Sequence, residues 1–133
     1  MPSFDEGATV VVESPALSAD DVNRQFGDRL RRLRESQRLS VRRLARLVAV
    51  SPSYLSRIER SHVPPPSERT IARIARALAI EADELLAAAG RLPEDVASRL
   101  LRRPRLMARL VRLADTLPDD AIEELCRAAD NRT

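Results

Sequence analysis

Residues 41–60 read VRRLARLVAVSPSYLSRIER, and this stretch predicts two short helices joined by a tight turn. The first helix is expected to carry four apolar residues on one side: Leu44, Ala45, Leu47 and Val48. The pattern is interrupted at residues 49–52 and resumes with Leu55 and Ile58, three positions apart. Two short helices around a turn, in a basic setting, are the layout of a helix-turn-helix, a motif that reads DNA.

Further helices are expected on both sides of this stretch, at about residues 22–36, 68–79 and 82–89. Serines mark the helix starts, because a serine hydroxyl can accept an unpaired backbone N–H of the first turn: Ser40, Ser51 and Ser67. Pro52 suits the first position of a helix, and Gly90 suits the position after the last one. Hydrophobic residues make up 44% of the chain and aromatic residues only 2%, which favours packed helices and an all-α class.

The charge is distributed unevenly along the chain. Residues 22–76 carry 14 arginines and four acids, a net charge of +10, whereas residues 1–21 carry five acids and no basic residue. A segment this basic points to a polyanion, because nucleic acid releases counterions when arginines bind its phosphates. We interpret residues 1–21 as an acidic and mostly disordered arm.

The C-terminal third, residues 91–133, differs in character and is expected to form a small second unit of three short helices. The middle helix carries an apolar row at helical spacing, and we define the Leu row as these residues: Leu106, Leu110, Leu113 and Leu117. An adjacent row runs through Met107, Val111 and Ala114. Two rows are wide for a surface helix, so this helix is expected to bury much of itself.

Residues 26–89 resemble the lambda-repressor/Cro-type helix-turn-helix family, also called the XRE family. The resemblance is carried by FGDRLRRLRESQRLSVRRLARLVAVSPSYLSRIER and by PSERTIARIARALAIEADELL. It implies a five-helix domain, here residues 22–90, whose third helix enters the major groove of double-stranded DNA. The chain departs from the family at three turn positions usually held by glycine, namely Arg38, Ala49 and Ser61.

On this resemblance, the N-terminal half of the third helix faces base edges and places five residues near the bases: Ser51, Pro52, Ser53, Ser56 and Arg57. Arg57 is the strongest candidate, since a guanidinium matches the O6 and N7 atoms of guanine. Contacts to the DNA backbone are expected from Arg42, Arg43, Tyr54, Arg60, Ser61 and His62. The resemblance also implies an ion pair between Arg34 and Glu59 that holds the third helix against the first.

The sequence leaves the role of residues 91–133 open. Together with the helix expected at residues 82–89, the Leu row can join two copies into a homodimer that binds a palindromic operator. Alternatively, the row can pack on the first domain or within its own three-helix unit. An alternative function is an antitoxin or partner-controlled repressor whose C-terminal unit binds a toxin or a metallopeptidase.

An enzyme is not expected, because no nucleophile with a base, metal cluster or cofactor loop is present in the sequence. His62 is interpreted as a loop residue near phosphate, and Cys126, the single cysteine, as a core or interface residue. Neither a cofactor nor a metal is expected. The sequence predicts a cytoplasmic, nucleoid-associated regulator, most simply a repressor.

Overall fold

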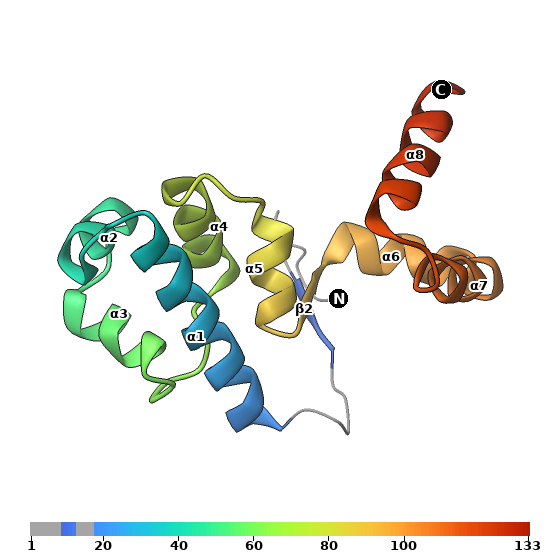
Figure 1. Ribbon diagram of the computed structural model, residues 1–133. Coiled ribbons are helices and arrows are strands. Elements are labelled where there is room, and N and C mark those ends of the chain that lie inside the picture. The colour runs from blue at the N-terminus through green and yellow to red at the C-terminus, as the bar shows by residue number, and fades with distance from the viewer. Residues whose placement is uncertain (1–8, 13–17) are drawn as a thin grey trace. The chain divides into compact units, whose positions relative to one another are not determined.

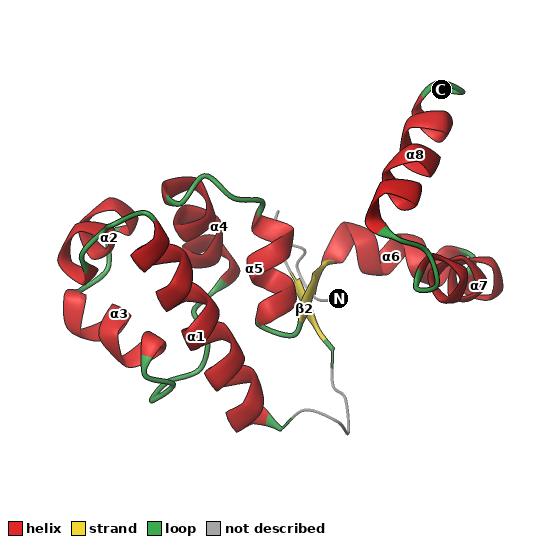
Figure 2. Cartoon of the chain, in the orientation of Figure 1, coloured by secondary structure: helices red, strands yellow, loops and turns green. Residues whose placement is uncertain are grey.

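The computed structural model describes residues 9–12 and 18–133 (Figure 1). The chain divides into two units, Met1–Glu94 and Asp95–Thr133, which are described separately below. The predicted all-α class is confirmed, because the described residues are mainly helical and contain a single pair of three-residue strands (Figure 2).

Five helices and two strands belong to the first unit: β1 (Thr9–Val11), α1 (Ala19–Ser36), α2 (Val41–Val48), α3 (Pro52–Glu59), α4 (Glu68–Ala77), α5 (Ala82–Ala88) and β2 (Arg91–Pro93). Three helices follow: α6 (Glu94–Arg102), α7 (Pro104–Ala114) and α8 (Asp119–Asp130). None of the described helices is long and apolar enough to cross a membrane.

Aliphatic side chains from α1 to α5 form the core of the first unit, with Phe26 as its one fully buried aromatic residue among those described. Helix α1 packs against α3 and α5, and α2 packs against α3 and α4. The expectation that Leu47 shares the buried side of α2 is wrong, because its side chain is 51% exposed. Leu44, Ala45 and Val48 fall within one helical stripe, whereas position 47 lies outside it.

The serine caps explain where the helices start. Ser40, Ser51 and Ser67 each accept a hydrogen bond from the backbone N–H three residues later. Ser18 does the same for α1 and forms a reciprocal capping box with Asp21. Helix α1 therefore begins at Ala19, three residues before the start expected from the apolar pattern.

Three of the turns use left-handed backbone at residues that are not glycine. Arg38, Ala49 and Ser61 have φ values of 57°, 60° and 65°. These are the positions at which the family usually has glycine, so the backbone keeps its path despite the added side chains. A non-glycine residue in this region carries a strain of about 1 kcal/mol. Ala79, with φ 55°, adds a fourth such position that the sequence pattern did not indicate.

The strand pair changes the expectation for the N-terminal arm. Strand β1 pairs with β2 in antiparallel register, with Val10 opposite Leu92, and the Val12 N–H donates to the Gly90 carbonyl at 2.7 Å. Residues 9–12 are therefore ordered on the segment that leads out of the first unit, which corrects the expected disorder for these residues. Residues 1–8 and 13–17 lie outside the described part of the chain.

Gly27 brings α1 close to the C-terminal end of α3. A Cβ atom at this position would lie 2.6 Å from the Ile58 carbonyl oxygen and 2.9 Å from that of Glu59. Helix propensity alone favours alanine here by about 1 kcal/mol. We expect Gly27→Ala instead to lower the free energy of unfolding by about 1–3 kcal/mol, because the clash is with backbone that cannot rotate away. Urea denaturation measures this change.

The exposed neighbour Gln25 supplies the control, since Gln25→Ala alters the same helix without touching α3. Its effect on the free energy of unfolding should remain within about 0.5 kcal/mol. An increase in stability for Gly27→Ala would show that the two helices do not approach as closely as described.

The helices of the second unit do not bury the apolar surface that the sequence led us to expect. No residue in Asp95–Thr133, all of which the structure describes, is buried. The expectation that α7 buries much of itself is thus wrong for the single chain. The reason is that α6, α7 and α8 do not pack against one another along their lengths.

Candidate nucleic-acid interface

Helix α3 is divided sharply into a buried and an exposed side. Leu55, Ile58 and Glu59 are buried against the core. Pro52, Ser53 and Arg57 are exposed on the other side, and Ser56 is partly exposed. We call these four residues the reading face. Its polar and cationic groups are those that can contact base edges in a major groove.

Arg57 carries the one charged side chain of the reading face. It is exposed, and its guanidinium has no ion pair or hydrogen bond within the described residues. A guanidinium carries five N–H donors in a planar fork. All of them are available to a guanine edge or to a phosphate.

Ser51 and Tyr54 have roles inside the domain that the sequence only partly indicated. The Ser51 hydroxyl oxygen accepts from the Tyr54 backbone N–H at 3.1 Å, so this oxygen is used in the helix cap. Its hydroxyl hydrogen can still be donated. Tyr54 is partly buried and packs on the hydrophobic core, with the rest of its side chain accessible beside the reading face.

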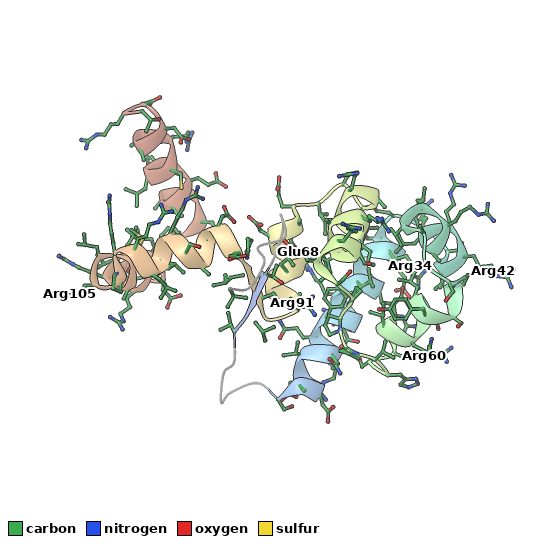
Figure 3. All side chains as sticks on the ribbon, turned by 180° about the vertical axis from the view of Figure 1, so that it is seen from behind. Arg34, Arg42, Arg60, Glu68, Arg91 and Arg105 are labelled. Atoms are coloured by element: carbon green, nitrogen blue, oxygen red, sulfur yellow. The ribbon has the colours of Figure 1, made fainter. Side chains whose placement is uncertain are left out.

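Basic side chains flank the reading face on two sides. Arg42 and Arg43 lie in the first turn of α2, and Arg60 follows the last residue of α3; all three are exposed. Helices α2 and α3 form one edge of the domain, and Figure 3 shows Arg42 and Arg60 at this edge. Ser61 is partly exposed and His62 is exposed in the loop that follows. These groups can position a DNA backbone without reading its sequence.

An ion pair fixes α3 against α1. Arg34 donates from Nε to Glu59 Oε2 at 2.8 Å and from Nη2 to Glu59 Oε1 at 2.9 Å. A third donor, Nη1, binds the Leu39 carbonyl at 2.8 Å, where the turn before α2 begins. The side chains of Arg34 and Glu59 are only 12% and 6% exposed. The hydrogen bonds to Glu59 raise the pKa of Arg34, which keeps the guanidinium charged.

The same pair shapes the electrostatics of the interface. Helix α2 contains no acid, and Glu59, the one acid of α3, is turned inward onto Arg34. Two exposed arginines of α1 are paired with acids, Arg29 with Glu84 and Arg31 with Glu35. The arginines of α2 and α3, in contrast, are not offset by any exposed acid of these two helices.

Other candidate groups do not assemble into a site. His62 lies in the first unit and Cys126 in the second. Cys126 is exposed, so the expectation of a core position is wrong, and the alternative of an interface position stays a prediction. Among the described residues, no group of histidine, cysteine and acidic side chains could hold a metal ion.

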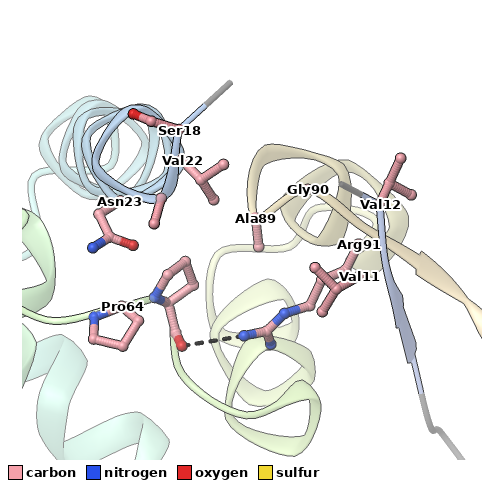
Figure 4. Close-up of a pocket in the computed structure, with 11 residues that line it drawn as sticks. Val11, Val12, Ser18, Val22, Asn23, Pro64, Ala89, Gly90 and Arg91 are labelled. Carbon is pink, nitrogen blue, oxygen red and sulfur yellow. Dashed lines mark hydrogen bonds between the residues drawn. The ribbon is translucent and has the colours of Figure 1, made fainter. Parts of the chain in front are cut away.

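A pocket of about 470 Å³ lies where β1, the start of α1 and the loop after α3 meet (Figure 4). Arg91 lines this pocket. Its guanidinium donates to the Pro66 carbonyl at 2.6 Å and to the Pro65 carbonyl at 3.3 Å. This contact ties the proline loop that follows α3 to β2. Sequence reasoning missed Arg91, because no local pattern links it to a loop 25 residues earlier.

Comparison with known proteins supports the helix-turn-helix assignment. The family model described as "Helix-turn-helix domain" matches residues 25–89. The HTH-type transcriptional repressor RghR of Bacillus subtilis (strain 168) is 41% identical over 69 residues, which are 52% of this chain and 51% of RghR. The chain thus spans about half the length of this curated relative.

Two solved structures are similar to part of this chain. The restriction-modification controller protein C.AhdI from Aeromonas hydrophila is 40% identical, with a TM-score of 0.45 over 47% of this chain and 94% of C.AhdI. The clp gene regulator ClgR from C. glutamicum is 32% identical, with a TM-score of 0.46 over 51% of this chain and 87% of ClgR.

Proposed function

The chain belongs to the lambda-repressor/Cro-type (XRE) family of helix-turn-helix regulators, and from this premise we propose that it is a sequence-specific DNA-binding repressor that acts as a homodimer on a palindromic operator. The observation that carries the proposal is the division of α3. Its single acid is buried on Arg34, whereas Arg57 is exposed and has no partner within the described residues. An exposed guanidinium in a field of uncompensated positive charge is suited to a DNA groove.

The three flanking arginines provide a direct test. Log affinity falls linearly with log salt concentration, and each phosphate contact steepens this slope by about 0.9. We expect the triple variant Arg42→Ala, Arg43→Ala, Arg60→Ala to bind every duplex more weakly and to lose about three units of slope per protein chain. Fluorescence anisotropy with labelled duplexes at several salt concentrations measures both quantities.

Helix α4 offers a matched control, because Arg69, Arg73 and Arg76 are equally exposed but belong to another helix. The triple alanine variant of these three residues should keep the wild-type slope to within about one unit. Equal losses in the two variants would mean that binding follows total charge and not the α2–α3 surface.

A homodimer is proposed because one small domain contacts only a few base pairs of DNA. Two copies related by a two-fold axis present two α3 helices to half-sites about one helical turn apart, roughly 34 Å. The Leu row supports the second unit as the joining surface, because its four leucines are between 38% and 60% exposed in the single chain. Exposed apolar rows of this kind mark interaction sites.

Disrupting the Leu row should separate the two copies. We expect Leu110→Asp with Leu113→Asp to weaken dimerisation at least about 100-fold, because carboxylates would be placed in the joined apolar surface. Analytical ultracentrifugation of the full chain measures the assembly. Leu47→Asp, at an exposed leucine of the first unit, should leave the dimer intact; a stable dimer in the double variant would place the joining surface elsewhere.

A further inference from the structure

The second unit exposes much of its apolar surface. Besides the Leu row, three large apolar residues are more than half exposed: Leu101, Val111 and Leu125. Thirty-nine residues without one buried side chain cannot hold together by a core of their own. The missing apolar contacts must come from outside this unit.

The charges of this unit are separated along the chain. Residues 96–114 contain six arginines and no acid, whereas residues 115–133 contain six acids and two arginines. The basic part covers most of α6 and all of α7, and the acidic part covers α8. None of the α7 arginines forms an ion pair with an acid of α8 in the described chain.

The helical spacing places these charges beside the apolar surfaces. On α7, Arg105 and Arg109 are four positions apart and run along one flank of the Leu row. Arg105 points away from its helix into open space (Figure 3). On α8, Glu123 and Glu124 flank an apolar side that includes Ile122 and Leu125. One flank of the Leu row is thus basic, whereas both edges of the apolar side of α8 carry an acid.

We propose that α8 of one copy covers the Leu row of a second copy, with an acidic flank of α8 facing Arg105 and Arg109 of that copy. The inference rests on the homodimer of the proposed function and specifies how it is built. A two-fold axis repeats the contact, so that each copy gives its acidic helix and receives the other. A second copy is the occupant that the charges favour. In a second copy the basic α7 meets the acidic α8, so the charges attract. An anionic surface would repel α8.

Charge reversal tests the arrangement in the full chain. The variant R105E/R109E replaces two arginines of α7 with acids, and E123R/E124R replaces two acids of α8 with arginines. Each variant alone then opposes like charges in a homodimer, so its dimer dissociation constant should rise at least about 100-fold. In an equimolar mixture every α7 meets an α8 of opposite charge, and the heterodimer should return to within about tenfold of the wild-type constant. Sedimentation velocity measures all three samples.

The matched control is R69E/R73E, which reverses two exposed arginines at the same spacing and the same helix position on α4. It should dimerise as the wild type does. If both α7 and α8 variants remain dimers, the inference fails while the dimeric repressor stands. If the variants become monomers and the mixture stays monomeric, α7 and α8 pair within one chain and the inference is again wrong. A monomeric wild-type chain would contradict the proposed homodimer itself.

Discussion

Glu59→Ala is expected to lower the free energy of unfolding by about 3 kcal/mol, the largest loss of stability that we predict for a single side chain. The substitution leaves the Arg34 guanidinium, only 12% exposed, without the two hydrogen bonds that it makes to the carboxylate. Removing one member of a buried ion pair costs about 3–5 kcal/mol, because the remaining charge is left uncompensated. Urea denaturation followed by circular dichroism measures the loss.

Two companion variants identify the cause. The exposed pair between Arg31 and Glu35 is a control of the same chemistry, and Arg31→Ala should cost at most about 0.5 kcal/mol. The double variant Arg34→Met, Glu59→Leu removes both charges and should recover part of the loss, since no unpaired charge remains. Equal small effects from Glu59→Ala and Arg31→Ala would contradict a locking role for the buried pair.

Arg57→Ala is expected to reduce affinity for the operator by about 10- to 100-fold, with a much smaller effect on unrelated duplexes. A guanidinium that contacts a guanine contributes about 1–3 kcal/mol of discrimination. Fold stability should be unaffected, because Arg57 is exposed and its side chain forms no hydrogen bond or ion pair with the described residues. Competition binding with operator and unrelated DNA separates the two effects.

A basic residue outside the reading face provides the comparison. Arg43→Ala should weaken binding to operator and unrelated DNA by similar factors, as expected for a phosphate contact. If Arg57→Ala also weakened both kinds of DNA equally, Arg57 would be a backbone contact and the base-reading role would belong to another residue of α3.

Local signals in the sequence predicted most of the first unit. The Ser51-Pro52 start of α3 is a combination of cap and first-turn proline that fixes a helix boundary without help from distant residues. The reading face follows from it, since burial of Leu55 and Ile58 directs Pro52, Ser53 and Arg57 to the exposed side of α3. The position of Leu47 was mistaken, because a short helix has too few turns to distinguish the edge of a stripe from its centre.

Features that depend on distant residues could not be read in this way. The close approach at Gly27 and the bond from Arg91 to Pro66 join segments that are far apart in the sequence. The burial of α7 was overestimated because apolar periodicity shows that a surface will be covered but does not show by which chain. Ser18 was missed as a cap, although a serine followed three residues later by Asp21 is a recognisable capping signal.

The most direct test of the account is a selection of bound duplexes from a random DNA pool, carried out in parallel with the wild-type protein and with Arg57→Ala. The account predicts that the wild type recovers a palindrome whose half-sites lie about one helical turn apart. The variant should lose base preference at one symmetric pair of positions and keep the rest. Recovery of no common sequence by the wild type, or of the same sequence with undiminished preference by Arg57→Ala, would contradict the reading of DNA through the exposed side of α3.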